Sequence, residues 1–331
     1  MSDTLSRKPP RAVFWGKLAW HPAVVAWTAF AAGAAAPESI EVLRNGKKSG
    51  TYRLVSAGPK GESIIAQRAP VARALIERAV YERILPHLTV IAPRYYGSRA
   101  EGRDFVWLFL EDVGDERFSK TDPAHAELAA RWVGAMHTGA TGVAAARDLP
   151  DGGPPRYRDH LRAGRHTIRV HLANPALTPA AVTMLEHLSV DLDALESRWA
   201  GIEAACTGVP ATLTHGDIQR KNIYIRSVAN GPALFLIDWE TAGWGMPASD
   251  LPLVDLPTYW SVVRPFWPHV RLKDVQRLAV VGRIFLQLAG IRWVSPELAY
   301  DRALYLSRPT AWLRVLHERL ADAVRDLEAL T

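Results

Sequence analysis

Apolar and polar residues alternate in short runs over the first third of the chain, a pattern typical of β-strands. The pattern is clear in "SIEVLR", "TYRLVSAG" and "SIIAQRA", which are separated by "NGKKSG" and "GPKGE", whose Gly and Pro residues suit tight turns. Two more strands are predicted in "RYYGSRAEGRDFVWLFLEDVG", where the apolar run "FVWLFL" indicates a strand buried on both faces. We therefore expect a small antiparallel sheet between Ser39 and Leu110.

Helical spacing of apolar residues appears once inside this region and dominates after it. The segment "VARALIERAVYERILPHL" has apolar residues on one helical face, and Pro86 is expected to end that helix. After Glu111–Asp115 the apolar spacing is helical in "PAHAELAARWVGAMHTGA" and in most of the chain that follows. The pattern predicts an α+β protein with a smaller, sheet-containing lobe at residues 39–112 and a larger, mainly helical lobe at residues 113–331.

The apolar run Ala23–Ala36 near the N-terminus allows two interpretations. It follows basic residues and ends in "AAGAAA", which is similar to a secretory signal with its cleavage site. A packed helix explains it better, because the preceding stretch is long and contains Trp15 and Trp20, and because Pro22 suits the first turn of a helix. No window holds eighteen consecutive apolar residues. We expect residues 1–38 to be a helical extension and the protein to be cytoplasmic, with no membrane partner.

Composition and charge narrow the classes of function only modestly. The 331 residues carry a net charge of +6 and a single Cys206, so an internal disulfide is excluded. The basic segment Arg156–His171 lacks the aromatic pattern of a nucleic-acid-binding surface, so we expect no nucleic acid partner. The sequence leaves the oligomeric state open.

The segment "LTHGDIQRKNIYIRSVANGPALFLIDWETAGWG" holds the candidate chemistry. "NIYIR" and "ALFLI" are strand-like, and Asn230-Gly231 between them is a strong hairpin signal. A turn centred there sets Asn222 opposite Trp239 and Ile223 opposite Asp238, so Asn222 and Asp238 meet at the open end. Asp217 precedes Asn222 by five residues, and we expect its loop to fold back to that end. Carboxylate and amide oxygens suit Mg²⁺ together with a phosphorylated substrate, and a second carboxylate can orient or deprotonate a hydroxyl.

The motifs "HGDIQRKN", "LFLIDWE" and "WGMPASDL" resemble those of the aminoglycoside phosphotransferase and choline kinase group of small-molecule kinases. The resemblance implies a bilobal, protein-kinase-like fold whose larger lobe carries a catalytic β-hairpin. It implies that Asp217 is the catalytic base and that Asn222 and Asp238 are Mg²⁺ ligands. His215 and Asp250 would then support the loop as scaffold.

The same resemblance extends to the first lobe and to the nucleotide. "WLFLEDVG" resembles the inter-lobe hinge, which implies that the carbonyl of Glu111 and the amide of Val113 bind the adenine of ATP, with GTP also possible. Glu77 matches the helix Glu that pairs with a phosphate-binding lysine, but Gln67 stands where that lysine is expected. Arg68, Lys47 or Lys48 could supply the missing charge, although strand alternation turns Arg68 to the opposite face.

We therefore expect an ATP- and Mg²⁺-dependent kinase that phosphorylates a hydroxyl of a small molecule. The basic segment favours a neutral or anionic acceptor over a polycationic aminoglycoside, although an aminoglycoside, another antibiotic or a choline-like amino alcohol remains an alternative. The aromatic segment "TYWSVVRPFWPH" either contacts the acceptor or packs in the core. A catalytically weak nucleotide-binding or scaffold protein is the second hypothesis, for which Gln67 is the main argument. A metal-dependent hydrolase is a third, which leaves "FLEDVG" and Glu77 unexplained.

Overall fold

The computed structural model describes residues 13–16, 18–46, 49–119, 121–229 and 231–330. Within these residues the chain forms two compact units. The first, here called the sheet unit, consists of Met1–Pro86, Val90–Phe118 and Arg220–Thr241. The second, here called the helical unit, consists of His87–Thr89, Ser119–Gln219 and Ala242–Thr331. The β-hairpin predicted to carry Asn222 therefore clusters with the sheet.

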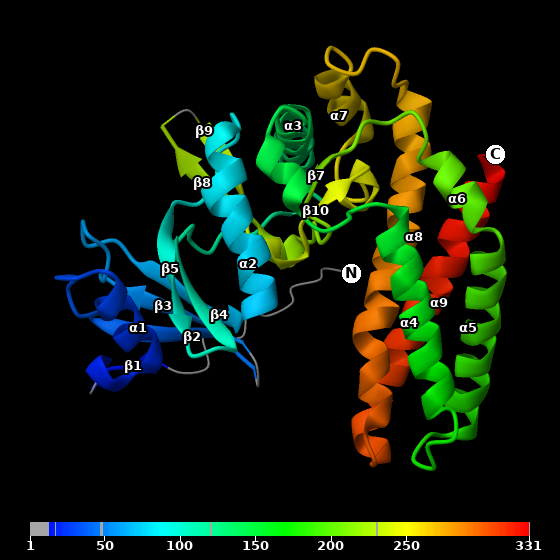
Figure 1. Ribbon diagram of the computed structural model, residues 1–331, viewed down its shortest axis with the longest axis horizontal. Coiled ribbons are helices and arrows are strands. Elements are labelled where there is room, and N and C mark those ends of the chain that lie inside the picture. The colour runs from blue at the N-terminus through cyan, green and yellow to red at the C-terminus, as the bar shows by residue number, and fades with distance from the viewer. Residues whose placement is uncertain (1–12, 17, 47–48, 120, 230, 331) are drawn as a thin grey trace. The chain divides into compact units, whose positions relative to one another are not determined.

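The sheet unit is built on an antiparallel sheet whose strand order is β1-β2-β3-β4-β6-β5 (Figure 1). Its strands are β1 (Val13–Phe14), β2 (Ser39–Asn45), β3 (Gly50–Val55), β4 (Ile64–Pro70), β5 (Tyr95–Glu101) and β6 (Phe105–Glu111). All five strands predicted from the alternation are present. Strand β1 was not predicted, because its two residues are too few to show an alternating pattern. The run Val106–Leu110 is buried along its whole length, as expected of a strand covered on both faces.

The two faces of the sheet are covered by different helices (Figure 1). Trp107 and Phe109 of β6 pack with Trp27 of α1 (Pro22–Phe30). The alternate residue Leu108 packs with Ala74 of α2 (Val71–Ala79). Because successive side chains of a strand point to opposite faces, each β4 or β6 side chain is committed to one of these two layers.

Helix α1 is a structural part of the sheet unit. The Trp27 side chain is 1% exposed, and its indole N–H donates to the carbonyl of Ala57 at 3.0 Å. Phe30, at the end of the helix, stacks on Phe109 with ring centroids 5.1 Å apart and fills the space beside Gly97. These contacts agree with the packed-helix interpretation of the apolar run Ala23–Ala36.

Helix α2 continues into one π-helical turn, Val80–Ile84, and one 3-10 turn, Leu85–His87. The α-helix therefore ends at Ala79, and the helical path continues through Pro86 to His87, one residue beyond the expected end. The remaining strands of the sheet unit are β8 (Ile223–Val228) and β9 (Gly231–Leu236), which form an antiparallel hairpin.

The helical unit contains seven α-helices among the described residues and one short two-stranded sheet. The helices are α3 (Pro123–Ala140), α4 (Pro154–His171), α5 (Pro179–Ser197), α6 (Trp199–Ala205), α7 (Leu256–Val263), α8 (Leu272–Val294) and α9 (Ala303–Ala329). The small sheet pairs β7 (Thr212–Thr214) with β10 (Gly243–Gly245), neither of which was predicted from the sequence. It joins segments that lie thirty residues apart in the chain, so local periodicity does not reveal it.

Helix α8 forms the centre of the helical unit, beside α4 and α9 (Figure 1). With the 3-10 turn that follows it, Leu272–Ala299 is long enough to cross a membrane and contains an 18-residue window with a mean hydropathy of 1.4. However, 56% of that window is buried inside the protein. A helix in the core of a globular protein is equally apolar, because it contacts apolar neighbours on most sides.

Candidate active site

The loop that carries Asp217 is held by one buried carboxylate. Strand β7 leads into His215-Gly216-Asp217, and Gly216 has a φ of +78°, a left-handed conformation that favours glycine. The Asp250 carboxylate accepts the backbone N–H of His215 at 2.7 Å and that of Gly216 at 2.9 Å. Two consecutive backbone groups are thus fixed directly before Asp217, so this loop has little freedom where the candidate base is attached.

Asp250 is itself supported from a third element. It is 0% exposed, and one of its oxygens lies 3.3 Å from Nε2 of His137 in α3, whose Nδ1 lies 3.0 Å from the Tyr259 hydroxyl in α7. Burial alone would raise the pKa of Asp250, but the hydrogen bond and charge of His137 and the charge and backbone N–H of His215 outweigh it and lower the pKa. Asp250 is therefore ionised at neutral pH and anchors the loop as a buried anion.

Asp217 projects from this supported loop and remains partly exposed. Its backbone N–H donates to Nδ1 of His215 at 3.2 Å, and its carboxylate accepts from the Gln219 side chain. Nearby, burial raises the pKa of Tyr157 in α4 to about 12, and the charges of Asp250 and Asp217 add to the shift. The first turns of α4 therefore lie close enough to Asp217 to interact with it electrostatically. A partly exposed carboxylate on a rigid loop is suited to accept a proton from a hydroxyl.

The β8–β9 hairpin carries Asn222 and Asp238, with a register that differs from our prediction. Ile223 pairs with Leu236, and Val228 with Gly231, so the expected pairing of Ile223 with Asp238 is wrong. Residues 229 and 230 separate the paired ends, rather than 230 and 231, and Asn230 lies outside the described residues. The physical reason is that Gly231, with φ of +107°, is the first residue of β9 rather than the second turn residue.

Both candidate ligands nevertheless follow from the open end of this hairpin. Beyond the Ile223–Leu236 pair, the carbonyl of Asn222 accepts the Ile237 N–H at 3.0 Å. Asp238 directly follows Ile237 and therefore lies at the open end of the hairpin. Asn222 is 3% exposed, and Asp238 has a φ of +69°, which is uncommon for a residue with a side chain. Such backbone strain is found at sites that need a side chain in a fixed direction.

A buried carboxylate, Glu77, lies beside the Asp238 segment. Glu77 of α2 is 0% exposed and accepts a hydrogen bond from the Gln67 amide at 2.9 Å, while its other oxygen is buried without a hydrogen-bond partner. Burial and then the charges of Asp238 and Glu240 raise the pKa of Glu77 well above its ordinary value. Gln67 and Glu77 thus meet as the resemblance implies, but as a pair without a positive charge.

Arg68, Lys47 and Lys48 are the residues that could replace the missing lysine, and the structure describes only the first of them. Arg68 follows Gln67 in β4 but points to the opposite face, where it pairs with Glu101 and lies 3.5 Å over the Phe105 ring. The structure does not bring Arg68 to Glu77. Lys47 and Lys48 lie outside the described residues.

The candidate hinge follows the last strand of the sheet. Glu111 ends β6, and its backbone N–H donates to the Arg94 carbonyl at 2.8 Å. Val113 is 5% exposed and packs against Phe235 of the hairpin. Arg53 forms an ion pair with the intervening Asp112 at 2.7 Å. This segment is therefore held in place on both sides. A backbone segment that forms hydrogen bonds with a planar base needs such a fixed position.

The residues of the sheet unit fit a magnesium ion only if other ligands complete its shell. Asn222 and Asp238 offer hard oxygen atoms of the kind that Mg²⁺ prefers. In the part of the chain that the structure describes, no group of three or more His, Cys, Asp or Glu side chains is arranged to hold a metal ion. Such a site would depend on water and phosphate oxygens, which is how Mg²⁺ is usually bound in nucleotide sites.

The basic segment Arg156–His171 proves to be mostly paired. It forms α4, and its arginines pair with acids of α5: Arg158, Arg162 and Arg165 pair with Glu196, and Arg165 and Arg169 with Asp193. Arg156 donates to the Ala242 carbonyl at 3.3 Å. These ion pairs lower the positive charge of the segment without cancelling it, because four arginines share two carboxylates.

The aromatic segment 258–269 packs mainly in the core. Tyr259 is 1% exposed and Trp267 is 4% exposed, and the Trp260 indole donates to the Val270 carbonyl at 3.0 Å. Phe266 is the exposed member, at 66%. Of the two interpretations left open by the sequence, the structure favours packing for Tyr259 and Trp267.

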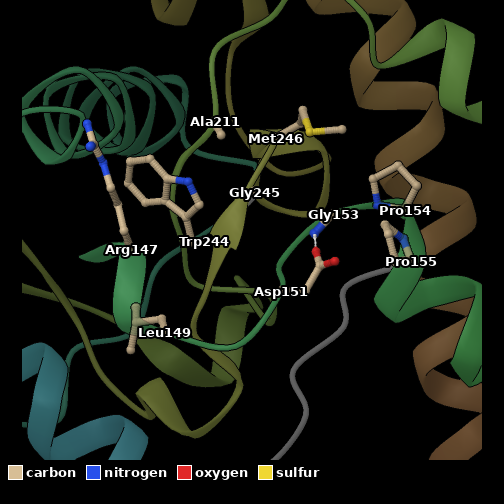
Figure 2. A pocket seen from close by; sticks show the side chains of 10 residues that line it. All are labelled: Arg147, Leu149, Asp151, Gly153, Pro154, Pro155, Ala211, Trp244, Gly245 and Met246. Carbon is tan, nitrogen blue, oxygen red and sulfur yellow. Dashed lines mark hydrogen bonds between the residues drawn. The ribbon is translucent and has the colours of Figure 1, made fainter. Parts of the chain in front are cut away.

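A pocket of about 370 Å³ lies in the helical unit and is lined by Ala211, which precedes β7, and by Trp244 and Gly245 of β10 (Figure 2). Asp217 is not among its lining residues. Figure 2 shows Asp151 accepting the Gly153 N–H at one corner of this pocket. Arg147 lies near Trp244 on one side, with its guanidinium 5.7 Å from the ring centroid. The pocket is open and combines apolar side chains with one cation and one anion.

Comparison with known proteins identifies the family. Residues 39–283 match the model of the phosphotransferase enzyme family, APH. The chain therefore belongs to this family and is a small-molecule kinase. No curated protein matches the sequence.

Solved structures show the same fold at low sequence identity. A choline kinase from Cryptosporidium parvum Iowa II has a TM-score of 0.60 at 12% identity, covering 88% of this chain and 90% of its own. The aminoglycoside phosphotransferase APH(2")-IIIa, in complex with GDP and kanamycin, has a TM-score of 0.59 at 13% identity, with 91% and 98% covered. Spectinomycin phosphotransferase APH(9)-Ia, with ADP and spectinomycin, has a TM-score of 0.55 at 11% identity, with 86% and 93% covered. The protein-kinase-like, bilobal α+β fold expected from the sequence is confirmed.

Proposed function

We propose that this protein transfers the γ-phosphate of ATP to a hydroxyl group of a small molecule. The observation that carries the proposal is the support of the Asp217 loop, in which Asp250 holds two consecutive backbone N–H groups at 2.7 and 2.9 Å. A partly exposed carboxylate on so fixed a loop has the geometry of a base that orients an attacking hydroxyl.

In this proposal the acceptor hydroxyl gives its proton to the Asp217 carboxylate. A bond forms between the acceptor oxygen and the γ-phosphorus, the bond from that phosphorus to the bridging oxygen breaks, and ADP leaves. Asn222 and Asp238 would hold Mg²⁺, which when bound neutralises charge on the phosphate groups. Glu111 and Val113 would bind the base through their backbone carbonyl and N–H. Nucleotide use is supported by relatives of the same fold crystallised with ADP or GDP.

The acceptor is a small molecule, and we keep a neutral or anionic alcohol as the first candidate. The charges of Arg156 in α4 and Arg292 in α8 both act on His160, near the start of α4. Burial and the charges of Arg156 and Arg292 lower the pKa of His160 to about 4, so this histidine is neutral at pH 7. Kanamycin, spectinomycin, choline and ethanolamine, which related structures bind or are named for, belong in the test panel.

Phosphate transfer to a panel of alcohols, compared between the wild type and Asp217→Asn, tests the proposal. We expect the substitution to lower kcat by about a hundredfold or more, because a positioned base contributes about 10²–10⁴, while Mg·ADP still stabilises both proteins. Asp322→Asn is a matched control, because Asp322 is an exposed carboxylate in α9. Equal turnover in the wild type and Asp217→Asn across the panel would disprove the assignment of the base.

A second function has one specific observation in its favour. The Gln67–Glu77 pair lacks a positive charge at the point where the resemblance implies a lysine, as expected of a catalytically weak nucleotide-binding or scaffold protein. Mg·ADP binding without transfer to any acceptor, together with transfer by Gln67→Lys, would favour this alternative.

We propose that the protein acts in the cytoplasm.

A further inference from the structure

The carboxylates around Asp238 attract arginines from two other elements of the sheet unit. Glu240 follows Asp238 by two residues and is joined to Arg73 of α2, whose Nη1 lies 3.3 and 3.2 Å from the two carboxylate oxygens. Arg44, near the end of β2, also acts electrostatically on Glu240. Arg73 and Glu77 are four residues apart in α2 and so lie on one helical face.

The charge balance of this region needs these arginines. Glu240 follows Asp238 by two residues, and the Arg73 guanidinium lies within hydrogen-bond distance of both Glu240 carboxylate oxygens. Glu77 adds a buried carboxyl with one oxygen unpartnered, and Gln67 brings no charge. A nucleotide would add several negative charges to a region that already holds three carboxyl groups, so binding needs cationic groups nearby in addition to a metal ion.

We propose that Arg73, assisted by Arg44, takes the place of the missing strand lysine and binds the phosphate groups of the nucleotide. Glu240 pairs with the Arg73 guanidinium in the absence of nucleotide, and phosphate oxygens displace it when nucleotide binds. The exchange is feasible because Arg73 is 38% exposed and Glu240 21% exposed in their side chains, so the pair is not sealed in the core. A guanidinium suits this task, because its planar fork binds phosphate by two parallel hydrogen bonds.

This inference rests on the proposed function, and nucleotide binding separates the two. Calorimetry with ADP, AMP and adenosine is carried out on the full chain and on Arg73→Gln and Arg44→Gln. We expect Arg73→Gln to weaken ADP binding by about tenfold to a hundredfold, as for the loss of a charged hydrogen-bonding group, with a smaller effect for Arg44→Gln. Adenosine, which lacks phosphate, should bind all three proteins equally.

Arg78→Gln is the matched control. Arg78 belongs to the same helix but pairs with Glu82 and is 46% exposed, so its loss should leave ADP binding unchanged. An equal loss of ADP affinity in Arg78→Gln and Arg73→Gln would overturn the inference, because it would indicate a general effect on α2.

Glu240→Gln distinguishes phosphate binding from a purely structural ion pair. If Arg73 binds phosphate, removing its competitor should leave ADP affinity unchanged or raise it. If Arg73 only fastens α2 to the Asp238 segment, Glu240→Gln should weaken ADP binding as much as Arg73→Gln does, and the inference is then wrong. A wild type that binds no nucleotide at all would instead contradict the proposed function.

Discussion

Replacement of Asp250 by Asn tests the central support of the candidate active site. The carboxylate accepts backbone N–H groups on both oxygens and lies beside His137, with no exposed surface. An Asn side chain has one acceptor oxygen, so its NH₂ group must face either the His215 or the Gly216 N–H. One buried donor then loses its partner and the charge that faced His137 disappears.

The magnitude follows from these contacts. Removing one partner of a buried charged arrangement costs about 3–5 kcal/mol of unfolding free energy, of which an unsatisfied buried donor accounts for about 1–3 kcal/mol. Urea unfolding at pH 7, followed by circular dichroism, measures this loss. Asp322→Asn makes the same chemical change at a surface ion pair and should cost less than about 1 kcal/mol.

The pH dependence gives an independent test of the same reasoning. Because the folded-state pKa of Asp250 lies below its ordinary value of 3.8, its contribution to stability is complete above pH 3.8 and is lost as the pH falls through the folded-state pKa. The difference between the wild type and Asp250→Asn should therefore narrow only in acid. A loss in Asp250→Asn no greater than in Asp322→Asn at pH 7 would refute the idea that this carboxylate holds the loop.

Two further substitutions test other buried contacts. Glu77→Gln should stabilise the protein relative to the wild type, and increasingly so as the pH rises above 4.5. The reason is that the pKa of Glu77 in the folded protein lies well above its ordinary value, so the wild type is most stable at low pH, with Glu77 protonated, and loses stability as the pH rises. Thermal unfolding across pH measures this, and parallel profiles for the two proteins would contradict it. Gly282→Ala should cost about 3 kcal/mol, because a Cβ there would lie 1.8 Å from the Ala248 carbonyl oxygen. Gly201→Ala, in a helix with open space at that position, should instead stabilise by about 0.5–1 kcal/mol, so similar urea midpoints for the two alanine variants would count against the steric argument.

The sequence was sufficient for the features that depend on local pattern. Alternation identified β2 to β6, and helical spacing identified α2, whereas Pro86 marks the last 3-10 turn after it rather than the end of α2 itself. The position of Asn222 and Asp238 at the open end of a hairpin was also predictable, but their register was not. Asn230-Gly231 is a strong turn signal, yet the pairing of Val228 with Gly231 moves the connection by one residue.

Contacts between distant segments were not predictable in this way. His137 and Tyr259 belong to helices whose apolar stripes looked like ordinary core, and neither segment alone indicates a bond between them. The arginines of α4 appeared as a positive surface, because their partners Asp193 and Glu196 come from the following helix. The contact of Arg73 with Glu240 joins residues 167 positions apart in the chain, and neither segment alone indicates it.

The packing of α1 has a practical consequence for handling this protein. A truncated chain that starts at Ser39 would lack β1, Trp27 and Phe30, and the large apolar side chains that pack against α1, such as Trp107 and Phe109, would be left in water. Exposed apolar surface of that kind promotes self-association. Fragments designed around the family match at residue 39 should therefore precipitate, whereas those that retain Pro22–Phe30 should remain in solution.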